Sequence, residues 1–122
     1  MAPAQRFLAV LAALMGAAGV ALAAAGAHSA GDEFARTASL FLILHAATLI
    51  GVCAYRAGPW PTVAGLLLAI GAILFAADLS MRAFAGARLF PFAAPIGGTT
   101  MIVAWLGLAA AFAFKRRSRE AD

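Results

Sequence analysis

Charged side chains are scarce in this sequence: 11% of its 122 residues are Asp, Glu, Lys or Arg, while 65% are apolar. Soluble domains are about a quarter charged and about half apolar. The chain has too few polar side chains to cover a water-soluble core, which excludes a soluble enzyme and a nucleic-acid-binding module. Disordered segments are poor in apolar residues, so a disordered tail is excluded as well.

Groups that carry chemistry are equally few. Cys53 is the single cysteine, so the chain has no partner for an internal disulfide and no cysteine metal-ligand spacing. The sequence also offers no Ser–His–Asp set and no cluster of metal-ligating residues. We therefore expect no catalytic residues, no metal and no bound cofactor, and predict that the protein is not an enzyme.

Long uncharged segments are abundant. Four runs contain no Asp, Glu, Lys or Arg, at residues 7–31, 37–55, 57–77 and 89–114. About 20 apolar residues cross the hydrocarbon core as a helix, and none of the runs shows the alternating polarity of a β-barrel strand. The sequence predicts one transmembrane domain over residues 1–122, an all-α membrane protein built as a four-helix bundle. We expect helices at about 6–27, 36–55, 61–82 and 96–114, then a basic tail at 115–122.

The positions of Lys and Arg predict the orientation. With the N-terminus inside, the six basic residues on the cytoplasmic side are Arg6, Arg56, Lys115, Arg116, Arg117 and Arg119. The three on the opposite side are Arg36, Arg82 and Arg88. Because cytoplasmic loops are enriched in Lys and Arg, both termini are predicted to be cytoplasmic. The pI of 10.7 then reflects topology and a tail near anionic lipid headgroups, with no nucleic-acid partner.

Small residues recur in the first predicted helix at spacings of three and four, which places them on one face. This small-residue seam consists of Ala9, Ala12, Gly16, Gly19, Ala23 and Gly26, with Leu8, Leu11, Met15 and Leu22 away from it. Such seams let membrane helices approach closely, so we expect this helix to pack within the membrane. A secretory signal cleaved after Ala27 or Ser29 is the alternative, but the apolar stretch exceeds the about 7–15 residues of a signal core.

His45 lies near the middle of the second run and is the polar residue expected deepest in the membrane. Two interpretations stay open: a neutral imidazole hydrogen-bonded to a carbonyl or hydroxyl of a neighbouring helix, or an imidazole that carries protons or binds a ligand. Trp105 is expected at a similar depth, and its indole N–H would find a partner in His45. His28 ends the first helix about 12 Å away in depth, which argues against a haem held by both histidines.

Asp78 is the only carboxylate within a predicted span. It lies about 25 Å along the third helix from Pro61, near the outer interface. Arg82 follows at i+4, the favourable acid-before-base order. The sequence predicts an Asp78–Arg82 ion pair that closes the end of this helix. Binding of a lipid headgroup, or ordering of the following loop, is the functional alternative.

Pro95 is expected to open the fourth helix, followed by Gly97, Gly98 and Thr99. Proline is preorganised for a helix start, and Thr99 is suited to satisfying early backbone groups. The two glycines favour close packing against another backbone. An anion held by exposed N–H groups at the helix N-terminus is the alternative.

Several of these residues together resemble a known family. The segments are Gly26-Ala27-His28, His45-Ala46, Phe75-Ala76-Ala77-Asp78 with Arg82, and Pro95-Ile96-Gly97-Gly98-Thr99 before Trp105. Over about residues 10–112 the chain resembles the small four-helix membrane family called domain of unknown function 423, related to transmembrane protein 256 of animals. The Asp-to-Arg pair makes it similar to a proteobacterial branch. The resemblance implies a multi-pass protein of the bacterial inner membrane with both termini inside, and no established activity.

We therefore expect a non-enzymatic structural or accessory subunit, in contact with the lipid bilayer and with a second copy or a larger membrane complex. The alternative is a small transporter or channel in which His45 is the embedded polar group. An enzyme acting on lipids fits less well, because His45, His28 and Asp78 lie at unlike depths. Many family members place Tyr-Gln where this chain has Phe41 and Leu42, which weakens any chemistry built on a cluster with His45.

Overall fold

The computed structural model describes residues 1–28, 33–55 and 58–121, with side chains up to Phe114. Within these ranges the chain forms four helices and no strand: α1 (Pro3–Gly26), α2 (Glu33–Ala54), α3 (Pro59–Ala85) and α4 (Ala93–Ala121). All four are long and apolar enough to cross a membrane, which confirms the all-α class. Ser29 and Arg56, named above, lie outside the described residues, as do the side chains of the basic tail.

The helix boundaries agree with the sequence prediction to within three residues at every end except the last. α3 begins at Pro59 and not at Pro61, because proline lacks the N–H that a first helical turn leaves unpaired, so both prolines fit there. α4 does not stop at Phe114 but continues to Ala121. Lys, Arg and Glu are good helix formers, so the basic tail extends the helix.

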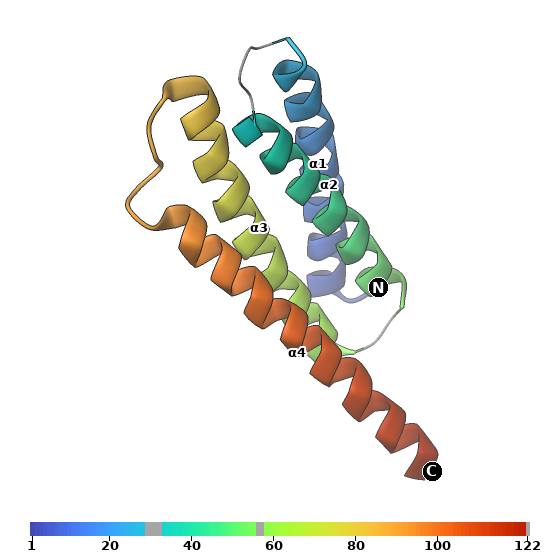
Figure 1. Ribbon diagram of the computed structural model, residues 1–122. Coiled ribbons are helices and arrows are strands. Elements are labelled where there is room, and N and C mark those ends of the chain that lie inside the picture. Colours follow the sequence, from blue (N-terminus) through green and yellow to red (C-terminus); the bar gives the residue numbers. More distant parts are fainter. Residues whose placement is uncertain (29–32, 56–57, 122) are drawn as a thin grey trace.

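Helices that follow one another in the chain are neighbours in space (Figure 1). α1 packs on α2, α2 on α3 and α3 on α4, with a smaller contact between α1 and α3. In the described ranges α4 makes no close backbone contact with α1 or α2. Both termini lie toward the same end of the bundle, where α4 extends past the other helices. The four-helix bundle is confirmed, and the side of the membrane that holds the termini stays a prediction.

The seam of α1 packs against α2, most tightly at Gly19. A Cβ at Gly19 would lie 2.7 Å from Ile43 Cγ1 and 3.2 Å from Leu42 Cβ, so only glycine fits at this crossing. The Ser39 hydroxyl donates a 2.7 Å hydrogen bond to the Gly19 carbonyl. Small residues at this contact thus allow both close packing and a polar link between the two helices.

Three residues of α1 contradict the seam as it was predicted. Leu8 and Met15, expected away from the contact, are buried at 0% and 3% exposure, whereas Ala23 of the seam is exposed. The buried face is therefore wider than the small-residue row and includes larger residues beside it. Leu8 reaches α3, because a Cβ at Gly65 would lie 2.8 Å from Leu8 Cδ2.

Candidate functional site

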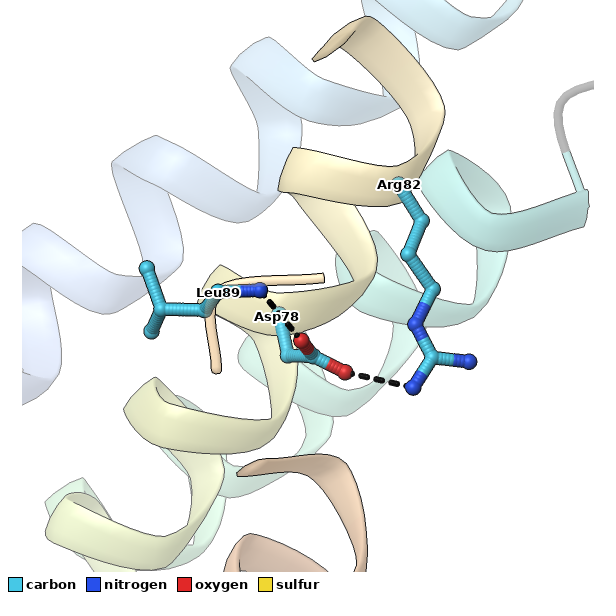
Figure 2. Close-up of polar contacts among 3 residues, drawn as sticks. All are labelled: Asp78, Arg82 and Leu89. Carbon is cyan, nitrogen blue, oxygen red and sulfur yellow. Dashed lines mark hydrogen bonds and ion pairs between the residues drawn. The ribbon is translucent and has the colours of Figure 1, made fainter. Parts of the chain in front are cut away.

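Asp78 forms the first of two polar clusters, and we call Asp78, Arg82 and Leu89 the Asp78 anchor (Figure 2). The Asp78 side chain is fully buried in α3, at 0% exposure. Its Oδ2 lies 2.7 Å from Arg82 Nη2. Its Oδ1 accepts a 2.8 Å hydrogen bond from the backbone N–H of Leu89, in the loop before α4. The ion pair expected from the i+4 spacing is confirmed.

Arg82 is less buried than Asp78 and makes fewer hydrogen bonds. Its side chain is 21% exposed, and among the described residues its Nε has no hydrogen-bond partner. The approach of Nη2 to Oδ2 is an ion pair by distance, but its angle is not that of a directed hydrogen bond. The guanidinium carbon also lies 5.7 Å from the ring centroid of Phe34 in α2, a distance at which a cation and an aromatic face attract. Arg82 thereby connects α3 to the start of α2.

The position of the pair differs from the sequence prediction. The pair does not close the helix, because α3 continues to Ala85 and ends at Gly86, whose φ of 67° is left-handed. The carboxylate instead reaches across the loop to Leu89. This loop also contains Phe92 at φ 67°, a conformation that disfavours an L-residue by about 1–2 kcal/mol. The contact with Asp78 therefore favours the loop-ordering role among the two functional alternatives.

His45 forms the second cluster, together with Phe41, Phe75 and Trp105, which we call the His45–Trp105 cluster. The His45 side chain is buried, at 7% exposure. Its Nδ1 lies 2.7 Å from the Phe41 carbonyl oxygen, and its Nε2 lies 3.3 Å from Trp105 Nε1. A carbonyl only accepts and an indole N–H only donates. The two contacts therefore require a neutral imidazole, with its proton on Nδ1 and its lone pair on Nε2.

The sequence thus identified the partner but not the whole arrangement. Trp105 donates to His45 as expected from their similar depths. The carbonyl, however, belongs to Phe41 of the same helix and not to a neighbouring helix. An i−4 carbonyl lies directly below a helical side chain, so a histidine of α2 reaches it without help from another element.

Aromatic contacts connect this cluster across three helices. The Phe41 and His45 rings are stacked with centroids 5.7 Å apart, and Phe41 meets Phe75 of α3 at 4.6 Å. Trp105 of α4 meets His45 edge-on at 6.0 Å. Side chains thus bridge α2 and α4, whose backbones stay apart. Because both imidazole nitrogens are occupied, His45 in this arrangement has no free atom for a metal or a substrate.

His28 is not part of either cluster. It follows the end of α1 and is exposed, while His45 is buried in the middle of α2. The described residues contain no group of three or more His, Cys, Asp or Glu placed to hold a metal ion. The two histidines are therefore separate features of the chain.

The start of α4 corrects the expectation for Gly97, Gly98 and Thr99. The helix begins at Ala93 and not at residue 96, so the glycines lie in the second turn, beyond the free N–H groups that bind anions. Thr99 is exposed there.

Gly97 instead marks the point where α4 crosses α3. A Cβ at Gly97 would lie 2.7 Å from Phe75 N and 2.8 Å from Gly71 O, whereas one at Gly98 would meet nothing within 4 Å. Close packing is therefore the role of Gly97 alone.

Four contributors to these sites escaped the sequence analysis. The Leu89 N–H and the Phe34 ring act through tertiary contacts that no local pattern announces. Gly71 and Ser39 carried a weak signal, as a glycine and a small polar residue inside apolar runs. Pairing Gly71 with Gly97 and Ser39 with Gly19 requires the helix arrangement itself.

The fold and the two clusters define a small multi-pass membrane protein in which His45 and Asp78 are held by contacts within their own chain. Residues 22–98 match the family described as "Protein of unknown function (DUF423)". The chain belongs to this family, as its residues suggested.

Its relatives place it in the inner membrane. The chain is similar to the UPF0382 inner membrane protein YgdD of Escherichia coli K12 and of Shigella flexneri, with 29% identity over 124 residues, covering 93% of this chain and 95% of each relative. No solved structure matches the chain. Together with the four candidate spans, these relatives confirm a multi-pass protein of the bacterial inner membrane.

Proposed function

We propose that the protein is a non-enzymatic structural or accessory subunit that acts by associating with other membrane helices. The state of its embedded polar groups carries this proposal. Both nitrogens of His45 are bound by Phe41 and Trp105. The Asp78 carboxylate accepts a hydrogen bond from Leu89 at Oδ1 and is ion-paired with Arg82 at Oδ2. Groups held in this way stabilise a fold and are not free to transfer protons or bind a substrate. The surface that remains available for association with other helices is apolar.

The outward face of α1 supports association. Opposite its contact with α2, this helix exposes a row of alanines at spacings of four and three, Ala13, Ala17, Ala21 and Ala24. Lipid tails gain nothing from small residues, but a second helix approaches closely over them. On α1, the larger exposed residues Val10, Leu14 and Val20 flank this row. α2 exposes a shorter row of small residues, Ala47, Gly51 and Ala54, beside Leu40, Leu44 and Ile50. The face of α1 that carries Ala17 is therefore suited to a helix of a second copy or of a larger complex.

A matched pair of leucine substitutions tests the proposal. Two differently tagged copies are expressed together and purified through one tag in mild detergent. We expect both tags to be recovered, with about tenfold less of the second tag for Ala17→Leu, the loss of about 1.4 kcal/mol of packing. Ala47→Leu makes the same change on the exposed face of α2 and should have no effect. Recovery of a free monomer from every sample would reject a subunit role.

The second candidate is a small transporter or channel, favoured by the position of His45 in the middle of a span. This function requires Trp105 to move aside, because its indole N–H occupies His45 Nε2. In reconstituted vesicles it predicts a proton or cation flux that His45→Ala abolishes. A flux that is the same in His45→Ala and in the parent protein excludes this use of His45.

A further inference from the structure

An apolar groove of about 750 Å³ runs between α3 and α4. Its bottom is formed where the helices touch, with Ala104 buried at 1% exposure and Gly107 directly opposite Ala64. Trp60 and Phe114 lie at one end and are 75% and 66% exposed. The groove thus has small residues at its bottom and aromatic residues at one end.

The lining defines the chemistry of an occupant. Its side chains are aliphatic, aromatic or proline, and the indole N–H of Trp60 is their only polar group. A buried polar group without a partner costs about 1–3 kcal/mol in proteins. The part of an occupant that enters the groove is therefore hydrocarbon.

Basic residues follow the last groove-lining residue of α4 in the sequence. Phe114, the last lining residue of α4, directly precedes Lys115, Arg116 and Arg117. The backbone of α4 stays helical through this segment. Trp60 at the same end is of the residue type enriched where a membrane meets water.

We infer that this groove binds an anionic phospholipid, with one acyl chain along Ala64 and Gly107 and the phosphate at the basic segment after Phe114. Apolar lining and adjacent basic charge match the two halves of such a lipid. A zwitterionic phospholipid fills the same groove but gains less from the charge. A second copy of the chain fits less well, because its own tail carries Lys115, Arg116, Arg117 and Arg119 against Glu120 and Asp122, so two copies would bring net positive charge together at this end. The site is separate from the α1 face of the proposed function.

Trp60 is a natural reporter of this groove, because the chain has only one other tryptophan. The full-length Trp105→Phe protein is reconstituted into vesicles, and Trp60 fluorescence is measured with phosphatidylglycerol or phosphatidylcholine carrying brominated acyl chains. We expect half-maximal quenching at an about fivefold lower mole fraction of the anionic lipid, the preference supplied by one basic residue at a charged membrane surface. The converse protein, Trp60→Phe, should show no preference at Trp105.

Three further variants distinguish the contribution of the apolar groove from that of the basic segment. Ala110→Leu adds a side chain to the exposed rim of the groove, while Ala109→Leu makes the same change at an exposed neighbour that does not line it. The anionic preference should be lost in Ala110→Leu and kept in Ala109→Leu. Replacing Lys115, Arg116 and Arg117 by Gln should remove the preference but leave quenching by either lipid.

Three results would overturn the inference. Equal quenching by the two lipids in the Trp105→Phe protein shows that no headgroup is selected. A preference that survives Ala110→Leu assigns selection to the basic segment without the groove. Self-association that is lost in Ala110→Leu and kept in Ala109→Leu gives the groove to a second copy of the chain.

Discussion

Asp78→Ala is expected to release the loop between α3 and α4. The substitution removes both contacts of the carboxylate, the 2.7 Å ion pair with Arg82 and the 2.8 Å hydrogen bond from Leu89 N–H. It also leaves the guanidinium without its counter-ion. Since Asp78 is fully buried, no water replaces the lost bonds at this position without rearrangement.

The expected loss of stability follows from these contacts. Removing one partner of a buried ion pair destabilises a protein by about 3–5 kcal/mol. Arg82 is 21% exposed, so solvent relieves part of its charge, and we expect about 3 kcal/mol for Asp78→Ala. Opening of the loop alone breaks the Leu89 bond, which contributes about 2 kcal/mol as a bond to a charged acceptor. Asp78→Asn keeps an acceptor oxygen for the Leu89 N–H, so this hydrogen bond should lose only about 1 kcal/mol of its contribution.

Trypsin reports on this bond directly, because Arg88 is exposed and the peptide bond after it carries the Leu89 N–H. Cleavage of the detergent-solubilised protein is followed by the mass of the fragment that ends at Arg88. We expect cleavage to be about 30-fold faster in Asp78→Ala and about fivefold faster in Asp78→Asn, provided that opening and reclosing are fast.

Ser80→Ala serves as the matched control for this experiment. It removes a hydrogen bond within α3, from Ser80 Oγ to the Ala76 carbonyl, and should leave the cleavage rate near that of the parent protein. Equal rates in Asp78→Ala and Ser80→Ala would refute the anchoring of the loop. Equal rates in Asp78→Asn and Asp78→Ala would assign the effect to charge and not to the bond with Leu89.

Three further expectations concern the helix crossing, the imidazole and the topology. Gly97→Ala should destabilise the protein by about 1–3 kcal/mol through a clash with the Phe75 backbone, whereas Gly98→Ala, in open space, should be neutral or stabilising in the same detergent unfolding assay. Trp105→Phe should cost about 1 kcal/mol by unpairing His45, and a double-mutant cycle with His45→Phe should show non-additive losses; additive losses would contradict the hydrogen bond. Green fluorescent protein fused to the C-terminus should fluoresce, because it folds to a fluorescent form in the cytoplasm. A dark fusion, together with an active alkaline phosphatase fused at the same end, would reverse the orientation.

The fold was largely predictable because the membrane makes its signals long and simple. Four uncharged runs sufficed to place four helices, since a bilayer leaves the backbone few alternatives. Errors arose at the ends, where local chemistry decides. Pro95 suggested a start at residue 96, but proline is tolerated throughout a first turn, and α4 begins at Ala93.

The candidate sites were predictable only where two residues share a helix or a depth. Asp78 and Arg82 are four residues apart on one helix, and His45 and Trp105 lie at matching depths in their spans, so both pairs were expected. The Leu89 N–H gave no sequence signal, because every residue except proline carries one. Its use depends on how the loop folds back over α3.

Association with other helices is tested most directly by measuring the mass of the complex that contains the protein after mild extraction from the membrane. Native mass spectrometry of inner-membrane vesicles opened in mild detergent should show the 12.4 kDa chain within a larger complex. We expect Ala17→Leu to release the monomer and Ala47→Leu to leave the complex intact. A mass of 12.4 kDa in the parent protein and in both variants would contradict the proposed function.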